Sequence, residues 1–255
     1  MRIVSRLLLF PLVAVFLVMA TQMAVRAVDR PVNLFYGKIN LIKENGVIRG
    51  YNASGFISVQ SLGGAEKVYV RYCYPDGNWK EVEAKYERQA ADGTSAWSFK
   101  TEDIFPSFHY YDFSCRFAIR YEVGGKTYWD NNGGKDYFIR STNVPVKENI
   151  PYVLGKSALF LEYSCRCNNG RQLEGGIILK NLGYNKTVKI IYTTDNWGTV
   201  KEAYASYAES FATGLERWTF HLTDLPTNGK VKFCIAYTVN GTTYWDNNFR
   251  NDYQN

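Results

Sequence analysis

The sequence predicts an all-β protein made of two antiparallel β-sandwich domains in tandem. Three observations lead to this prediction. The chain repeats itself once, its apolar residues alternate with a period of two, and turn residues interrupt the apolar runs at short intervals. Long helical patterns are absent from the sequence. The 255 residues suffice for one or two domains, each able to bury a core without a metal or disulfide bonds.

The internal repeat is clearest near the end of each copy. Residues 125–132 read Gly-Lys-Thr-Tyr-Trp-Asp-Asn-Asn, and residues 241–248 read Gly-Thr-Thr-Tyr-Trp-Asp-Asn-Asn. Each copy then closes with an Asp-Tyr pair, at 136–137 and 252–253. The period of about 116 residues is far longer than a solenoid repeat of roughly 20 to 50 residues, which indicates a duplicated domain.

The domain boundaries follow from the repeat and from the prolines between the two copies. The first domain is predicted at 29–142 and the second at 153–255, joined by a linker at 143–152 that contains Pro145 and Pro151. Each copy is predicted to form about seven or eight strands.

A hairpin near the end of each copy sets the direction of its side chains. Asn-Gly at 240–241 favours a two-residue type I′ turn, and Gly-Gly at 124–125 serves the first copy. This register places Trp129 and Trp245 on the more polar face of their strands, away from the core. A misjudged register that buries both rings is the alternative.

Two further tryptophans lie in turn sequences. Trp79 follows Pro-Asp-Gly-Asn and Trp197 follows Asp-Asn, so both are expected in surface loops. By contrast, Trp97 and Trp218 alternate with phenylalanines and are interpreted as core residues. Each copy therefore offers two indole rings outside its core, which predicts a binding surface.

Amide side chains accompany the exposed tryptophans. A pyranose has an apolar C–H face that stacks on an indole and a rim of hydroxyl groups that bond to amides. The candidate amides follow Trp129 and Trp245 in sequence: Asn131, Asn132, Asn247 and Asn248. Turn formation is the alternative role for these asparagines.

Charge and the N-terminal segment indicate the compartment. Residues 1–27 have a basic start, an apolar run over 7–20 and small residues before the predicted cleavage after Ala27, which is typical of a secretory signal peptide; Ala20 is the other candidate. The run is too short for a membrane-spanning helix, so we expect a secreted protein with no membrane contact after cleavage, and an uncleaved anchor is the alternative. The net charge of +6 falls by three without this segment, which argues against a nucleic-acid partner.

The cysteines and histidines predict disulfides and no metal site. Cys73 and Cys115 are both absent from the second copy, as expected of a bonded pair, and Cys234 is predicted to pair with Cys165 or Cys167. The two histidines lie far apart and no Cys-x-x-Cys motif is present, so neither metal nor cofactor is expected. Three sequons are possible glycosylation sites, at Asn52, Asn185 and Asn240.

The closing motif Trp-Asp-Asn-Asn, the upstream Asp-Asn-Trp and the strand junction Asn-Leu-Gly-Tyr-Asn-Lys resemble the starch-binding modules of carbohydrate-binding family 21. Such modules occur on fungal glucoamylases and on glycogen-targeting subunits of type-1 protein phosphatase. The resemblance covers both copies and implies immunoglobulin-like sandwiches that bind α-1,4-glucans such as starch, glycogen and maltooligosaccharides.

The resemblance also assigns residues to two sites. The main site would use one tryptophan pair with its asparagines in each copy: Trp79, Trp129, Asn131 and Asn132, then Trp197, Trp245, Asn247 and Asn248. A further aromatic of the family is replaced by Ala118 and Cys234. The second site would use Tyr184 and Tyr207, and we expect it in the C-terminal copy because Gly64 stands opposite Tyr184 while Tyr86 stands opposite Tyr207.

Three other functions are weighed against glucan binding. An enzyme would need paired carboxylates, and the only recurrent acids are Asp130 with Asp136 and Asp246 with Asp252, whose place beside turns favours capping. A phosphatase-targeting subunit is suggested by Lys-Val-Lys-Phe at 230–233, which we interpret as core strand. A secreted or cell-surface module that binds protein is the third alternative. We expect a non-catalytic protein.

Overall fold

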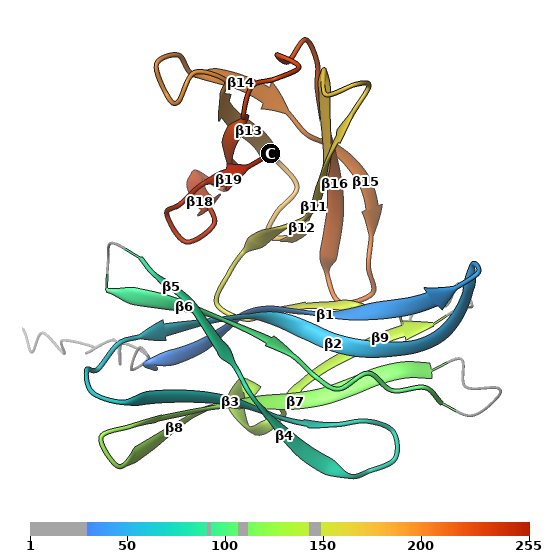
Figure 1. The fold of residues 1–255 in the computed structure, drawn as a ribbon, viewed down its shortest axis with the longest axis vertical. Helices are drawn as coiled ribbons and strands as arrows, with labels where there is room; N and C mark the ends of the chain where they lie inside the picture. Colours follow the sequence, from blue (N-terminus) through green and yellow to red (C-terminus); the bar gives the residue numbers. More distant parts are fainter. Residues whose placement is uncertain (1–29, 91–92, 107–111, 143–148) are drawn as a thin grey trace, which may run out of the picture.

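The chain folds into two β-sandwiches, shown in the computed structural model of Figure 1. The structure describes residues 30–90, 93–106, 112–142 and 149–255, so the predicted signal peptide lies outside the described residues. The strands of the first domain are β1 (Val32–Glu44), β2 (Val47–Gln60), β3 (Glu66–Cys73), β4 (Trp79–Glu83), β5 (Lys85–Gln89), β6 (Thr94–Lys100), β7 (Asp112–Val123), β8 (Lys126–Asp130) and β9 (Tyr137–Thr142). A short 3-10 turn, η1 (Asn132–Gly134), precedes β9.

The second domain repeats this order after a connecting strand, β10 (Tyr152–Leu154). Its strands are β11 (Leu159–Cys167), β12 (Gln172–Lys180), β13 (Lys186–Thr193), β14 (Lys201–Tyr204), β15 (Ser206–Ser210), β16 (Leu215–Leu222), β17 (Lys232–Val239), β18 (Thr242–Asp246) and β19 (Tyr253–Gln254). The predicted all-β class and the two tandem sandwiches are confirmed.

Each domain packs two antiparallel sheets face to face. In the first domain the orders are β10-β1-β2-β6-β5 and β4-β3-β7-β8, with β9 paired to β7. In the second they are β11-β12-β16-β15 and β14-β13-β17-β18, with β19 paired to β17. Apolar side chains at alternate positions fill the space between the sheets and form one core cluster per domain. This alternation is why the period of two in the sequence identifies the fold.

Each domain has more strands than the expected seven or eight because one extended run serves both sheets. Strand β4 pairs with β3 in one sheet, and β5 pairs with β6 in the other, with the buried Ala84 between them. The second domain repeats the crossing at Ala205, between β14 and β15. A small residue at the crossing lets the chain turn inside the sandwich without displacing core side chains.

The hairpin registers agree with those expected from the sequence. Trp245 lies opposite Ala236, and Trp129 lies opposite Arg120. Positive φ angles at Asn240 and Gly241 match the two turn positions that Asn-Gly favours. Phe233 and Tyr237 of β17 point into the core, which leaves the alternate residues on the outer face.

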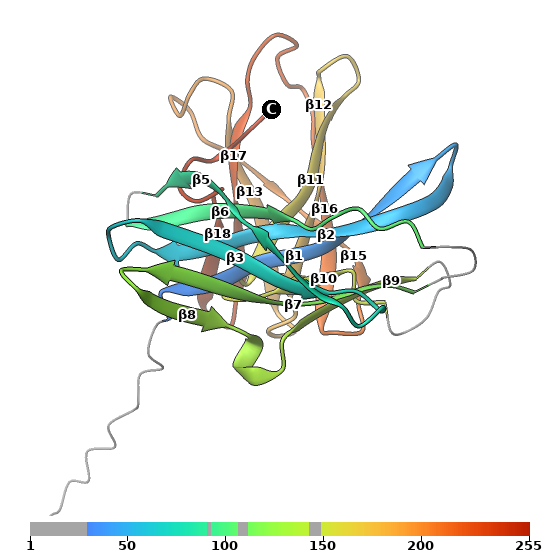
Figure 2. The ribbon, with the colours of Figure 1, turned by 60° about the horizontal axis from the view of Figure 1, so that its bottom comes forward.

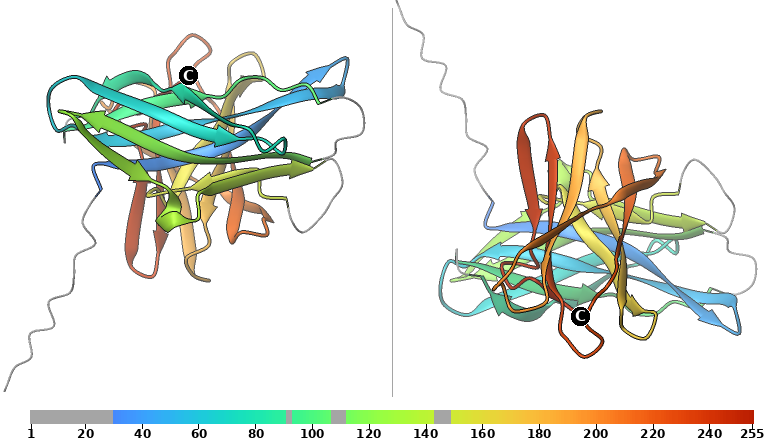
Figure 3. Two further views of the ribbon diagram at one scale, coloured as in Figure 1. Left: turned by 90° about the horizontal axis from the view of Figure 1, so that it is seen from below. Right: turned by 90° about the horizontal axis from the view of Figure 1, so that it is seen from above.

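The two domains share a packed interface. Strand β10, at the start of the predicted second domain, pairs with β1 at the edge of the first domain's sheet. The ring of Tyr36 stacks on that of Phe160 with centroids 4.0 Å apart, and Phe35 lies 4.7 Å from Phe249. Figures 2 and 3 show the strands of the two sandwiches running across one another. Apolar contact of this kind fixes the domains relative to each other.

The predicted disulfides are wrong, because all five cysteines are free thiols. Cys73 lies opposite Arg116, so its side chain and that of Cys115 point to opposite faces of the sheet. Cys234 lies on the outer face of the β17 sheet, whereas Cys165 and Cys167 lie on the outer face of the other sheet of the sandwich. The width of the sandwich therefore separates Cys234 from both predicted partners.

Two other sequence features are placed by the structure. Val231 and Phe233 are buried in the second core, as the interpretation of residues 230–233 as core strand requires. Of the sequon asparagines, Asn185 is exposed, while Asn52 is buried and donates to Asp103 at 2.8 Å. Within the described ranges, the structure contains no helix of the length and hydropathy needed to cross a membrane.

Candidate functional site

In the first domain, the outer face of the β4-β3-β7-β8 sheet carries the two predicted tryptophans. Trp79 begins β4, not a loop as predicted, and is 41% exposed; Trp129 on β8 is 39% exposed. The two strands form opposite edges of the sheet. Three strand spacings and an offset of four residues separate the tryptophan backbones by on the order of 20 Å. The surface is therefore elongated, which suits a chain ligand better than a single sugar.

Charged and small side chains lie between the two rings. The guanidinium of Arg71 stands 5.2 Å from the centroid of Trp79 and holds that indole against the sheet. Arg120, beside Trp129, donates two hydrogen bonds to Glu81, at 3.1 and 2.6 Å. Ala118 occupies the middle of the face and is buried. The position that carries a further aromatic ring in other members of the resembled family is therefore a small side chain opposite Arg71.

In the second domain, Trp245 is the more open ring, with 54% of its surface exposed. Trp197 lies in the turn before β14 and is half-buried, at a positive φ of 71°. Its indole Nε1 donates to Asp252 Oδ2 at 3.1 Å, which ties the ring to the β18–β19 loop. Both predicted tryptophans thus adjoin the loop that also carries Asn247.

The turn that presents Trp197 is held by one carboxylate. Asp195 accepts hydrogen bonds from the backbone nitrogen and the hydroxyl of Thr199, both at 2.8 Å, and from the hydroxyl of Thr193 at 2.7 Å. These bonds, that from Thr193 above all, lower the pKa of Asp195 to about 2. The ionised carboxylate therefore stabilises the turn.

The four asparagines take part in turn formation. Asn132 and Asn248 each donate through Nδ2 to the backbone oxygen of the aspartate four residues later, at 3.0 and 2.9 Å. Asn131 and Asn247 accept through Oδ1 from the backbone nitrogen three residues later, at 3.1 and 2.9 Å. Both Asn132 and Asn248 have φ near 52°. The amides thus shape the loop beside each exposed tryptophan.

The recurrent acids Asp130 and Asp246 are structural. Asp246 is buried and accepts hydrogen bonds from the Tyr253 hydroxyl at 2.7 Å and from the Leu161 backbone at 2.8 Å. Burial raises the pKa of Asp246 above its ordinary value. Asp130 accepts from the Tyr137 hydroxyl and the Leu34 backbone, at 2.8 and 2.7 Å. Each carboxylate therefore ties the first strand of its domain to the closing motif.

A second aromatic surface lies at the edge of the second domain. Tyr184 is 96% exposed, and Tyr207 stands edge-on to Trp218 with centroids 6.2 Å apart. Together they line a cavity of about 780 Å³. Trp218, predicted as core, is half-buried and forms part of this wall. The surface combines two flat rings with a polar floor, as a sugar ligand requires.

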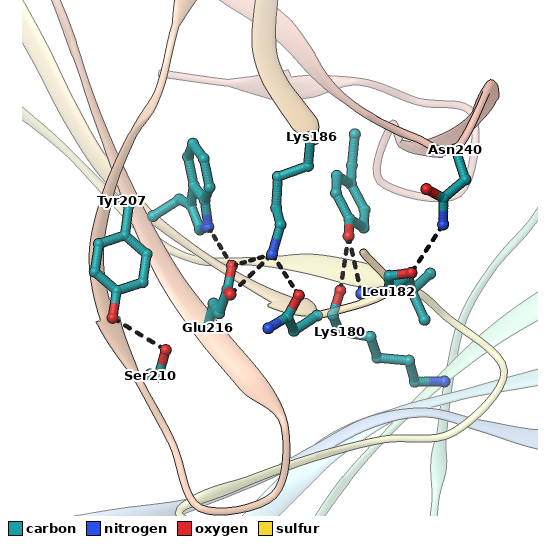
Figure 4. Close-up of polar contacts among 10 residues, drawn as sticks. Lys180, Leu182, Lys186, Tyr207, Ser210, Glu216 and Asn240 are labelled. Atoms are coloured by element: carbon teal, nitrogen blue, oxygen red, sulfur yellow. Dashed lines mark hydrogen bonds and ion pairs between the residues drawn. The ribbon is translucent and has the colours of Figure 1, made fainter. Parts of the chain in front are cut away.

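The floor of this cavity is a buried ion pair that the sequence analysis did not identify. Lys186 Nζ lies 2.8 Å from Glu216 Oε1, and each side chain is only 7% exposed. Glu216 also accepts from Trp218 Nε1 at 2.9 Å, so the pair fixes the orientation of that indole (Figure 4). The sequence signal for this ion pair is Glu216, a charged residue that alternates with the aromatic residues Trp218 and Phe220 in β16.

The first domain keeps only half of this second surface. Tyr86 is exposed and lies edge-on to the buried Trp97, whose centroid is 5.4 Å away. Gly64 stands where the second domain has Tyr184, at a φ of 92°. No ring is therefore present to complete the pair.

The main surface of the second domain meets the first domain. A cavity of about 340 Å³ beside Trp245 is lined by residues of both domains, among them Ser58 and Asn247. Arg88 of β5 donates to the backbone oxygen of Asn248 at 2.9 Å and also to its side chain, and it lies 5.6 Å from the ring of Phe249. No local pattern predicts this contact, because it joins positions 160 residues apart.

The fold is a β-sandwich module that presents exposed aromatic rings and turn-forming amides on the outer face of one sheet in each domain. Residues 37–140 and 153–255 both match the carbohydrate/starch-binding module of family 21, and the chain belongs to this family.

Relatives of two kinds share the module. Protein phosphatase 1 regulatory subunit 3C of Bos taurus is 33% identical over 89 residues, which are 33% of this chain and 28% of that protein. Glucoamylase 1 of Rhizopus oryzae is 37% identical over 92 residues, 34% of this chain and 14% of that protein. The matched regions are thus less than a third of each relative.

Solved structures show the same likeness. The starch-binding domain of Rhizopus oryzae glucoamylase, solved with beta-cyclodextrin and maltoheptaose, is 29% identical, with a TM-score of 0.33 over 39% of this chain and 93% of that domain. The carbohydrate-binding module of the muscle glycogen-targeting subunit of protein phosphatase-1 is 26% identical, with a TM-score of 0.34 over 38% of this chain and 74% of that module.

Proposed function

We propose that this chain is a secreted, non-catalytic protein that binds α-1,4-glucans such as starch and glycogen through both of its modules. The open indole of Trp245, repeated as Trp129 on the same outer face of the first domain, carries the proposal. Exposed rings at the same register of a duplicated fold favour a repetitive ligand. Membership of family 21 supports a glucan as that ligand.

Each residue of the main surface has a separate task in this proposal. Trp79 and Trp129, like Trp197 and Trp245, stack on the apolar faces of successive sugars. The carbonyl oxygens of Asn131 and Asn247 serve the turn, so we assign their amide nitrogens to sugar hydroxyls. Asn132 and Asn248 hold the loop and act indirectly.

The second surface, formed by Tyr184 and Tyr207, gives the C-terminal module another contact with the polymer. Tyr184 stands almost free of the sheet, where it can lie against a passing sugar ring. Affinity electrophoresis in gels with soluble starch, glycogen or dextran tests the ligand class. Retardation in starch and glycogen but not in the α-1,6-linked dextran is expected, and equal mobility in all three gels contradicts the proposal.

The recurrent acids hold the fold together, which supports a protein that binds the glucan without hydrolysing it. Asp130 and Asp246 are buried and hydrogen-bonded to tyrosines, and neither faces the outer tryptophans. Glycoside hydrolysis usually needs two carboxyl groups about 5 to 10 Å apart on either side of the substrate bond. Release of reducing sugar from starch by the purified protein would contradict the non-catalytic part of the proposal.

Two modules on one chain make the second binding event intramolecular. This arrangement raises avidity by roughly 10² to 10⁴ when both sites reach one polymer. Separation of the modules near Pro145 is therefore expected to lower retention on insoluble starch well below that of the intact chain. Equal retention of a single, folded module would show that the second module adds nothing.

Secretion rests on the predicted signal peptide at 1–27. The mature protein is expected to begin at Val28 when its N-terminus is sequenced. An unprocessed cytosolic protein would instead favour a phosphatase-targeting role. The burial of Val231 and Phe233 speaks against that role, because a docking motif must be accessible.

A further inference from the structure

Four potential metal ligands lie together on the outer face of the β11-β12-β16 sheet. Cys165 is opposite Glu174 across one strand pair, and Glu174 is opposite His221 across the next. Cys167 follows two residues after Cys165 on the same face. The group lies toward the free end of the β11–β12 hairpin, which points away from the first domain in Figures 1 and 2.

The donor atoms are already close to coordination distance. One ligand atom each from Cys167, Glu174 and His221 lies within 4.8 Å of the other two. His221 Nε2 is 3.8 Å from Glu174 Oε1. Zn–S bonds of about 2.3 Å and Zn–N bonds of about 2.0 Å place neighbouring ligands of a tetrahedral site about 3.5 Å apart. Side-chain rotations that move atoms by about 1 Å would therefore bring these three ligands to coordination distance, without any shift of a strand. Cys165, opposite Glu174 on the same face, would supply the fourth ligand.

We propose that Cys165, Cys167, Glu174 and His221 form a binding site for zinc. Two sulfur atoms, one imidazole nitrogen and one carboxylate oxygen supply four protein ligands of the types that zinc prefers. Three neighbouring strands of one sheet hold the residues, so their spacing is set by backbone hydrogen bonds. Both Glu174 and His221 are exposed, which leaves a path for the ion.

The first domain provides an internal comparison. Its corresponding cross-strand row places Lys38 opposite Ser54, and Ser54 opposite Lys100. Two lysines at these positions repel a cation. The proposed site is therefore a property of the second domain's side chains and not of the shared fold.

The site is separate from the aromatic surfaces. Trp245 lies on β18 in the other sheet of the sandwich, and the cavity of Tyr184 and Tyr207 does not include any of the four ligands. A bound ion would link β11, β12 and β16 and stabilise the folded domain by mass action. The zinc proposal can therefore be tested independently of glucan binding.

The test uses the full-length protein, fully reduced, with Co²⁺ as a spectroscopic substitute for Zn²⁺. We expect a near-ultraviolet thiolate-to-cobalt band and the visible bands of tetrahedral Co²⁺, which saturate at one ion per chain and disappear when Zn²⁺ is added. Cys167→Ser and His221→Gln should each weaken Co²⁺ binding by more than tenfold. Cys73→Ser is the matched control, and it should keep the full spectrum.

The control for folding is starch retention and circular dichroism of each variant, which should match the wild type because the replaced side chains lie outside the core. Absence of the thiolate band in reduced wild-type protein overturns the proposal. An unchanged band in Cys167→Ser also overturns it.

Discussion

Removal of the open indole rings should abolish most glucan retention and leave the fold intact. Because Trp245 is 54% exposed, about 100 Å² of its surface is available to a ligand. At about 25 cal/mol per Å², full coverage contributes roughly 2.5 kcal/mol, and coverage of one ring face contributes about half of that. Trp245→Ala should therefore weaken oligosaccharide binding at this site by between about 8-fold and 60-fold.

The double variant Trp129→Ala/Trp245→Ala removes one ring from each module. Its loss on polymeric starch should exceed that of either single variant, because avidity between the two modules is also lost. Affinity electrophoresis in soluble starch measures the effect. Phe105→Ala is the matched control, since it removes an exposed aromatic ring from a loop that belongs to neither surface.

Stability provides the second readout for these variants. Trp129 and Trp245 belong to neither core cluster, so the free energy of unfolding should fall by no more than about 1 kcal/mol. Undiminished retardation of the folded double variant would refute the reasoning, because it would place the ligand away from both rings.

Three further outcomes are expected. Arg88→Ala removes charge-assisted hydrogen bonds to Asn248 and should lower the free energy of unfolding by about 2 kcal/mol; an unchanged denaturation midpoint would contradict this. Lys186→Met leaves the buried carboxylate of Glu216 without its cationic partner. The free energy of unfolding, measured by urea titration, should fall by about 3 to 5 kcal/mol. A fall of less than about 1 kcal/mol would count against the ion pair. The pKa of Asp195 is about 2, below its ordinary 3.8. The stabilising contribution of its carboxylate is therefore complete above pH 3.8 and is lost as the pH falls toward 2. The difference in unfolding free energy between the wild type and Asp195→Asn should shrink over that window, and a pH-independent difference would contradict this prediction.

Local chemistry explains why the hairpins could be predicted. A two-residue turn between β17 and β18 leaves one register, and that register decides which face Trp245 occupies. The same reasoning succeeded for Trp129. It was less successful for Trp79, which begins a strand, because turn residues before a tryptophan do not show where pairing starts.

Contacts between distant segments explain the failures. The predicted disulfide partners of Cys234 lie on the opposite sheet of its sandwich, which no spacing in the sequence reveals. Trp218 packs against the core as predicted, but it also lines a cavity and donates to the buried Glu216, which its place in the sequence does not reveal. Half of the candidate amides hold loops through Nδ2, so residue type alone could not separate ligand contacts from turn contacts.

The amino-acid sequence by itself determined the duplication, the sandwich class and the outward direction of Trp129 and Trp245, since repeats, alternation and tight turns are local properties. Only the tertiary structure decided that Arg88 of one domain reaches Asn248 of the other, and that Cys167, Glu174 and His221 meet on three strands. These groupings depend on how strands separated in sequence pair within a sheet and how two sheets and two domains pack. Such choices minimise the free energy of the whole chain and leave no mark in any short segment.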